Sequence, residues 1–114
     1  MFNEGSCKRI LDLGCGDAFF EEQFPERFIG VDIDMVRLNQ ARQRGVPRLI
    51  LGSAESLPFV DGAFDGVLLK DVLEHFYLEQ AFRILHEVSR VLELGGMLIV
   101  TTTKNTQSFW DKPD

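Results

Sequence analysis

The sequence contains little cysteine and little histidine, and this limits the kinds of site it can build. Of its 114 residues, two are cysteine and two are histidine. Cys7 and Cys15 are too few and too close together for a disulfide framework, and His75 and His86 stand far along the chain from them. The sequence therefore predicts neither a disulfide nor a metal site. Its cysteine usage favours the reducing cytoplasm as the location of the protein.

Positive charge and long apolar runs are also scarce. Lysine and arginine number 12 against 18 aspartates and glutamates, which gives a formal net charge of −6. Without a compensating basic patch, this balance argues against a general affinity for nucleic acid or for an anionic membrane. No apolar segment approaches the length needed to cross a bilayer, and the first residues, MFNEGSCKR, lack the core of a signal peptide. We expect neither nucleic acid nor a membrane as a partner.

The rest of the composition is ordinary for a globular domain, with 45% hydrophobic and 26% charged residues. The length allows a single domain over 1–114, in which residues 104–114 form a polar tail. Short apolar runs predict strands at 9–13, 27–33, 47–53, 64–70 and 97–103. Amphipathic stretches between them predict helices at 17–24, 34–44 and 78–92, the second capped by Asp34 and the last ended by Gly95-Gly96.

The alternation of strands and helices indicates an α/β fold. Strands joined by crossovers, and apolar without strict alternation, are typical of a parallel sheet covered on both faces. Because such crossovers are right-handed, the sheet is expected to be doubly wound, with ligands bound beyond the C-terminal ends of its strands. The first glycine-rich turn, in LDLGCGDA, falls at that edge.

Four features fall at C-terminal strand ends: the turn Gly14-Cys15-Gly16, then Asp32, the stretch 53–55, and Lys70-Asp71. The turn alone is weak evidence, because glycine is common wherever a strand turns into a helix. Asp32 is more informative, since a carboxylate at the end of the second strand can accept both hydroxyls of a ribose. Together these features predict a nucleoside site.

The turn does not resemble a phosphate-binding loop. Phe19 stands where the third glycine of a dinucleotide fingerprint belongs, and no lysine follows the turn to meet a phosphate. The acidic residues nearby favour a cation over a pyrophosphate; they are Asp12, Asp17, Asp32 and Asp34.

At this point the sequence resembles a known family. LDLGCGDA, VDID, GSAESLPFVDGAFDGVLLKDVLEHF and LHEVSRVLELGGMLIVTTT are similar to the successive motifs of class I S-adenosylmethionine-dependent methyltransferases. The resemblance covers residues 9–103, and its nearest branch is the small-molecule type that includes quinone-biosynthesis methyltransferases. It implies a Rossmann-like sheet of about five strands in the order 3-2-1-4-5. The implied cofactor is S-adenosylmethionine, and the implied partner is a small-molecule acceptor methylated by in-line displacement.

The resemblance also implies a role for each matching position. Glycine backbone at the first turn lies against the methionine part of the cofactor, Asp32 holds the ribose, and the stretch 53–55 grips the adenine edge. The implied cofactor-binding residues are Asp12, Gly14, Cys15, Gly16, Asp32, Ile33, Met35, Ser53, Ala54, Glu55, Lys70, Val72 and Leu73. Two positions depart from the family pattern: Ala18 stands where a third glycine is usual, and Ser53 stands where an aspartate is frequent.

No catalytic residue is assigned by these motifs. His75 and Glu74 are the candidates for a base near the acceptor, and we favour a structural role for His75 because base catalysis depends on geometry that a sequence does not give. His86 is expected to be exposed on the long helix.

The chain is short for this family, whose members usually have a helix before the first strand and antiparallel strands after the fifth. We therefore expect a truncated cofactor-binding core, with residues 97–103 left as a sheet edge. An unpaired apolar edge invites association, so the edge predicts either a homodimer or cover by the tail that carries Phe109 and Trp110. Two alternatives to a methyltransferase stay open: a cofactor-binding module without its own acceptor site, and a nucleotide-dependent oxidoreductase, which Phe19 disfavours.

Overall fold

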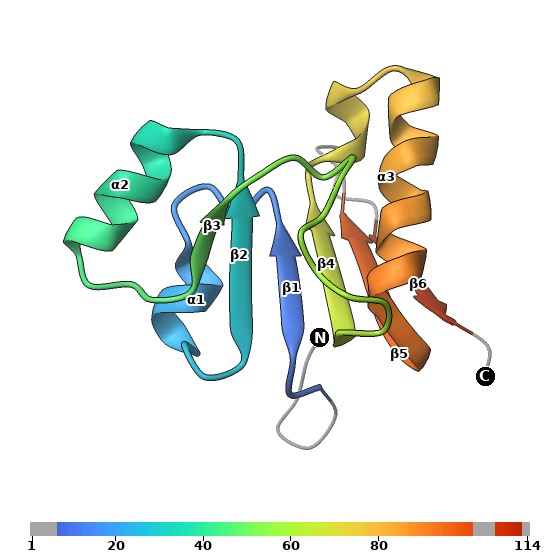
Figure 1. The fold of residues 1–114 in the computed structure, drawn as a ribbon, viewed down its shortest axis with the longest axis horizontal. Helices are drawn as coiled ribbons and strands as arrows, with labels where there is room; N and C mark the ends of the chain where they lie inside the picture. The colour runs from blue at the N-terminus through green and yellow to red at the C-terminus, as the bar shows by residue number, and fades with distance from the viewer. Residues whose placement is uncertain (1–6, 102–106, 113–114) are drawn as a thin grey trace.

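The computed structural model describes residues 7–101 and 107–112. Within them, six strands form one sheet in the order β3-β2-β1-β4-β5-β6, with helices packed against both faces (Figure 1). The elements in chain order are β1 (Ile10–Leu13), α1 (Phe19–Gln23), β2 (Phe28–Asp32), α2 (Met35–Gln43), β3 (Leu49–Leu51), β4 (Phe64–Lys70), the short 3-10 helix η1 (Leu73–His75), α3 (Leu78–Val91), β5 (Leu92–Thr101) and β6 (Gln107–Asp111).

The central strands are parallel and buried, as their apolar sequences predict. β1 lies between β2 and β4, with Ile10 opposite Phe28 on one side and opposite Gly66 on the other. β3 and β5 extend the parallel sheet on the two outer sides. The predicted order 3-2-1-4-5 and the doubly wound α/β class are therefore confirmed.

The two faces of the sheet bury different sets of side chains. Leu11 and Val31 pack with Ile84 and Val88 of α3 in the largest core cluster. On the other face, Phe28 packs with Phe20 of α1, and Ala18, Ala41 and Val46 form a further cluster at α2. Successive side chains of a strand point to opposite faces, which is why the neighbours Phe28 and Ile29 belong to different clusters.

The predicted cap of the second helix is present. The Asp34 carboxylate accepts hydrogen bonds from the backbone N–H groups of Val36 and Arg37, at 3.0 and 3.2 Å. Such a cap satisfies backbone donors that the first turn of a helix leaves free. It also fixes the chain direction immediately after Asp32, where the predicted ribose-binding carboxylate stands.

The end of the chain differs from the sequence-based expectation. β6 pairs antiparallel with β5, with Leu98 opposite Trp110 and Met97 opposite Asp111. The expectations of a fold without a C-terminal antiparallel strand, and of an exposed fifth-strand edge through which a homodimer forms, are therefore wrong. The polar tail includes a strand, because backbone pairing needs no apolar side chains. The alternative, in which this tail covers the edge, is confirmed for the described residues.

Several boundaries also shift. α1 begins at Phe19 rather than at 17, β3 keeps only three residues, and β5 begins directly after α3. Gly95-Gly96 lies inside β5, where the Gly95 N–H donates to the Lys112 carbonyl and the Lys112 N–H donates to the Gly96 carbonyl. The glycines thus continue the pairing with the C-terminal segment instead of separating helix from strand. In the part of the chain described, no helix is long and apolar enough to cross a membrane.

Candidate functional site

A cleft of about 380 Å³ lies at the C-terminal ends of β1, β2, β3 and β4, at the edge where the sequence places the site. Of the predicted site residues, the following line it: Gly14, Asp32, Ile33, Ser53, Ala54, Glu55, Lys70, Val72 and the base candidate His75. The remaining predicted residues do not: Asp12, Cys15, Gly16, Met35, Leu73 and Glu74. Asp71, which the sequence places with Lys70 at the end of a strand, also lines it. Five further lining residues were missed by sequence reasoning: Leu13, Val31, Arg37, Gly52 and Phe76.

The glycine turn is shaped by close packing. Gly14 has a φ of +73°, and a Cβ built there would lie 2.7 Å from Cγ2 of Val72, so only glycine allows this approach. Ala18 also has a positive φ, 59°. Alanine is a mild replacement for the family's glycine only where the helix start has a negative φ, and that condition is not met. Ala18 therefore carries backbone strain directly before α1.

Asp32 presents a carboxylate whose orientation is set by two backbone donors. The Gly16 N–H donates to Oδ2 at 2.8 Å, and the Asp34 N–H donates to Oδ1 at 2.8 Å. Each carboxylate oxygen has about two acceptor positions, so one on each oxygen stays available to a ligand in the cleft. This arrangement suits the two neighbouring hydroxyls of a ribose.

Arg37 is a cleft residue that the sequence motifs did not indicate. A Cβ built on Gly16 would lie 2.9 Å from Nη1 of Arg37, so the guanidinium lies against the glycine turn. Its Nε is 3.8 Å from the Asp17 carboxylate, and both side chains are well exposed. The only sequence signal for this residue is its place in the first turn of α2, three positions after the cap Asp34.

Two carboxyl groups are buried beneath the turn rather than in the cleft. Asp12 and Glu21 are 3% and 0% exposed. Burial is the first cause that raises the pKa of Asp12 well above its usual value, and repulsion from Glu21 adds to it, while Lys70 opposes it. Burial also raises the pKa of Glu21. Asp12 thus lies under the turn instead of contacting the space where a ligand fits.

Cys15 and Lys70 occupy the two sides of this buried pair. Burial, followed by the nearby carboxyl Glu21, raises the pKa of the Cys15 thiol, so the thiol stays protonated and is not an activated nucleophile. The Lys70 ammonium lies 5.8 Å from the centroid of the Phe20 ring and lines the cleft at the end of β4. Asp71 follows it with a φ of 55°, and such strained residues are enriched at functional sites.

The wall formed by residues 53–55 is held by its own hydrogen bonds. The Ser53 hydroxyl oxygen accepts from the Glu55 N–H at 3.1 Å, so its proton stays available for donation. Glu55 is paired with Nε of Arg83, on α3, at 2.8 Å. The Glu55 side chain lines the cleft with one carboxylate oxygen already bound.

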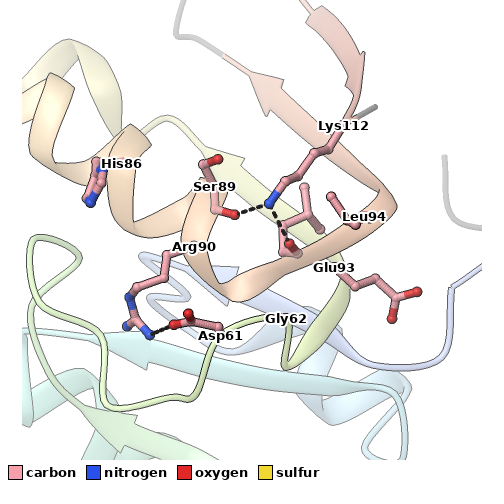
Figure 2. Close-up of a pocket in the computed structure, with 9 residues that line it drawn as sticks. Asp61, Gly62, His86, Ser89, Arg90, Glu93, Leu94 and Lys112 are labelled. Carbon is pink, nitrogen blue, oxygen red and sulfur yellow. Dashed lines mark hydrogen bonds and ion pairs between the residues drawn. The ribbon is translucent and has the colours of Figure 1, made fainter. Parts of the chain in front are cut away.

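The rest of this loop, to residue 63, is also attached to α3. Glu87 accepts a hydrogen bond from the Leu57 N–H at 2.7 Å. Arg90 donates to the carbonyls of Leu57 and Phe59, at 3.0 and 2.7 Å, and to the carboxylate of Glu87. It also donates to the carboxylate of Asp61 (Figure 2). Hydrogen bonding to Arg90 is the main cause that holds the pKa of Glu87 at about 2. The cleft wall is therefore fixed by a helix that does not itself reach the cleft.

The two base candidates lie in the segment after β4, and only one of them lines the cleft. His75 is exposed and lines the cleft, whereas Glu74 is exposed and does not. Leu73 packs against the core cluster instead of the cleft. His86 is exposed on α3, as expected.

The fold and the cleft define the chain as a doubly wound α/β protein with a nucleoside-type site where the winding reverses. Residues 11–100 match the family described as a methyltransferase domain. The chain therefore belongs to the methyltransferase-domain family. This agrees with the predicted resemblance to class I S-adenosylmethionine-dependent methyltransferases, without specific support for the quinone-biosynthesis branch.

Relatives and solved structures agree with this assignment. The malonyl-[acyl-carrier protein] O-methyltransferase of Legionella pneumophila is 32% identical over 90% of this chain and 40% of its own length. A SAM-dependent methyltransferase from Thermotoga maritima is 32% identical, with a TM-score of 0.70 over 88% of this chain and 45% of its own. The [4+2]-cyclase SpnF is 30% identical, with a TM-score of 0.69 over 82% of this chain and 38% of its own. The chain thus spans less than half the length of each.

The cofactor of this family is S-adenosylmethionine, and the cleft residues fit it. Asp32 offers two free acceptor positions for the ribose, and Ile33, 72% exposed, offers an apolar side chain beside it. Gly14 is exposed and lines the cleft. Among the described lining residues, Arg37 is the cation that α2 contributes, and its Nε is paired with the Asp17 carboxylate.

Proposed function

We propose that this chain forms the cofactor-binding core of an S-adenosylmethionine-dependent methyltransferase that acts on a small molecule. The observation that carries the proposal is the Asp32 carboxylate, oriented by the N–H groups of Gly16 and Asp34 at the mouth of the cleft. Neither Cys7 nor Cys15 forms a disulfide in the described chain, which suits the reducing cytoplasm where we place the protein.

The lining residues divide the cleft into three binding regions. Asp32 holds the ribose hydroxyls, and Ile33 packs against the adenine, whose edge meets Ser53, Ala54 and Glu55. Gly14 lies against the methionine part. Lys70 and Val72 close the cleft below it. These assignments are the roles that the family resemblance implies, given to those matching residues that line the cleft.

The cofactor supplies an electrophilic methyl group on a sulfonium centre. For an in-line displacement, the protein must hold an acceptor atom opposite the departing sulfur, and this positioning provides much of the rate. His75 is the titratable side chain at the cleft best placed to take a proton from an acceptor, since Glu74 points elsewhere. A proton acceptor matters only for acceptors that lose a proton during methyl transfer.

A second candidate function is a cofactor-binding domain that performs another reaction or none. A similar solved structure is named a [4+2]-cyclase, so this fold alone does not define methyl transfer. A turnover assay with a panel of hydroxyl, amine and thiol acceptors separates this candidate from a methyltransferase. Its readout is the formation of S-adenosylhomocysteine.

The proposal is tested by calorimetric titration of the chain with S-adenosylmethionine, S-adenosylhomocysteine and NAD. We expect binding of the first two and none of NAD, with Asp32→Ala weakening that binding at least about tenfold, because two charge-assisted hydrogen bonds are lost. Asp34→Asn is the matched control: it keeps the helix-cap acceptor two residues away and should leave affinity unchanged. Absence of heat with both sulfur compounds, or equal loss in the two variants, contradicts the proposal.

A further inference from the structure

A second and larger hollow lies at the opposite end of the sheet from the cleft. It measures about 580 Å³ and is lined by residues at the N-terminal ends of β1, β2, β3 and β4. Its apolar surface comes from Ile29, Ile50, Phe59 and Phe64, and its rim carries three arginines. None of these residues is among those to which the family resemblance gives a role in cofactor binding. We call this hollow the arginine groove.

The three arginines come from a repeated pattern in the sequence. Arg9, Arg27 and Arg48 each precede an aliphatic residue by two positions, in the triplets RIL, RFI and RLI that open three strands. Each arginine directly precedes β1, β2 or β3, and all three line the groove together with Ile29 and Ile50. Because Ile10 pairs with Phe28, and Gly30 with Leu49, the three strand starts are neighbours.

This face is open because no helix connects β3 to β4. Residues 52–63 form a loop, and only Phe59 and Ala63 from it border the groove. Ile29 and Ile50 are accordingly half-buried, although they pack against the main core cluster. In Figure 1 this loop runs from β3 across to β4 without a helix of its own.

The guanidinium groups are only partly used within the protein. Arg48 Nη1 donates to the Glu26 carbonyl at 3.0 Å, and in the described chain Arg48 forms no ion pair. Arg9 donates to the Ala63 carbonyl at 3.1 Å and is ion-paired with Glu93. A guanidinium has five N–H donors, so donors remain on both. The Glu26 carboxylate is the one acidic side chain on the rim.

We propose that the arginine groove binds a small amphiphilic anion, with its oxyanion head at Arg48 and its apolar body against Ile29, Ile50 and Phe59. The volume lies within the range of roughly 300–1,000 Å³ that is typical of small-ligand sites. Planar guanidinium groups suit carboxylate, phosphate and sulfonate heads alike. The site shares no lining residue with the cofactor cleft, so this proposal does not depend on the proposed methyl transfer.

The test compares two fluorescent probes that share one aromatic body. Anilinonaphthalene sulfonate carries an anionic head, and N-phenylnaphthylamine is its neutral counterpart. We expect the anionic probe to bind saturably to the folded chain and about tenfold more tightly than the neutral one, since charge-assisted hydrogen bonds add affinity. Displacement by octanoate and by octyl phosphate then shows which head group the arginines prefer.

Three variants locate the binding. Arg48→Gln keeps an unbranched side chain at this position, where the backbone φ is 56°. It should weaken the binding of the anionic probe about tenfold and leave the binding of the neutral probe unchanged. Glu26→Gln should strengthen the binding of the anionic probe, because it removes a negative charge from the rim. The hydrogen bond from Arg48 is kept, since it goes to the Glu26 backbone carbonyl and not to the carboxylate. Arg42→Gln, on α2 at the other face, is the charge-matched control and should change nothing.

Four results would overturn the proposal. Equal affinity for the neutral probe would make the groove a plain apolar patch. Unchanged binding in Arg48→Gln, with the same thermal midpoint as the parent, would place the probe elsewhere. Displacement by S-adenosylhomocysteine would place it in the cofactor cleft. If neither probe binds the folded chain, the groove takes no small ligand and a macromolecular partner is the remaining occupant.

Discussion

Glu21 is a carboxyl group on α1 that faces the sheet instead of the solvent. Gly30 makes room for it, because a Cβ built there would lie 3.0 Å from Cδ of Glu21 and 2.8 Å from Sγ of Cys15. Neither Glu21 oxygen has a hydrogen-bond partner of good geometry in the described chain. With Asp12 beside it, the two carboxyls resist losing both protons, since adjacent buried like charges are unfavourable. Their protonation therefore belongs to the pair.

We predict that Glu21→Gln flattens the pH dependence of stability. Because the folded pKa of Glu21 is raised, the folded chain holds a proton that the unfolded chain releases near pH 4. The stabilisation that this proton gives is therefore fully present below about pH 4 and is lost as the pH rises through the pKa of Glu21 in the folded state. The variant should gain on the order of 1 kcal/mol over the parent between about pH 5 and pH 8, measured by urea unfolding.

The control for this prediction is Glu22→Gln. Glu22 neighbours Glu21 on α1 but is exposed and paired with Arg44 at 3.4 Å, so its replacement should leave the slope unchanged. Parallel stability profiles for the parent and Glu21→Gln would show that Glu21 binds the same number of protons in the folded and unfolded chain, and would contradict a raised pKa for Glu21 in the folded state.

At the scale of elements, α3 supports the cleft through one polar face. Arg83, Glu87 and Arg90 are spaced by four and three positions, which places them on one side of a helix. All three bind the loop 52–63, at Glu55, at the Leu57 N–H and at the Leu57 and Phe59 carbonyls. This loop has no helix of its own to hold it. We call the three side chains the α3 staple.

We predict that Arg90→Lys loosens the loop and weakens cofactor binding. A lysine ammonium cannot reproduce a planar fork that reaches two carbonyls and two carboxylates at once. We expect a loss of about 1–3 kcal/mol in the free energy of unfolding, because buried carbonyls lose their donor. We also expect a several-fold higher Kd for S-adenosylhomocysteine, measured by calorimetry.

Arg42→Lys serves as the matched replacement, since Arg42 binds Asn39 and the Leu49 carbonyl on α2 and does not touch the loop. If Arg90→Lys lowers stability but leaves the Kd unchanged, the staple stabilises the fold without positioning the cleft. The Glu87 pKa of about 2 should rise in the same variant.

The sequence predicted this helix but not its polar contacts. The apolar spacing that predicts it includes Val88 and Val91, which are buried, but also Leu78 and Phe82, which are exposed, and it leaves out the buried Ile84. The staple joins positions about thirty residues apart, and periodicity within one helix carries no information on such partners. For the same reason Arg37 was missed, while Gly14 and Asp32 were found because strand ends of a parallel sheet meet at one edge.

At the scale of the whole molecule, the two outer strands of the sheet are β3 and β6. The parallel centre was predictable because buried strands consist of continuous apolar runs. β6 was not, because QSFWD has no clear alternation and its pairing depends on the edge that β5 offers. The Lys112 ammonium donates to the carbonyls of Ser89 and Leu92, at 2.6 and 3.1 Å, at the end of α3 (Figure 2).

We predict that removal of residues 107–114 causes self-association. β5 would then present unpaired N–H and C=O groups beside a buried apolar strand, and such edges pair with other chains. Lys112→Met is the control: it keeps β6 but removes a cation from the end of α3, which should cost about 0.3–1 kcal/mol without changing size. Sedimentation velocity should show the parent and Lys112→Met as the same species and the shortened chain as larger ones. A shortened chain that sediments like the parent would mean that β5 is protected without β6, and the sheet edge would then have no part in keeping chains apart.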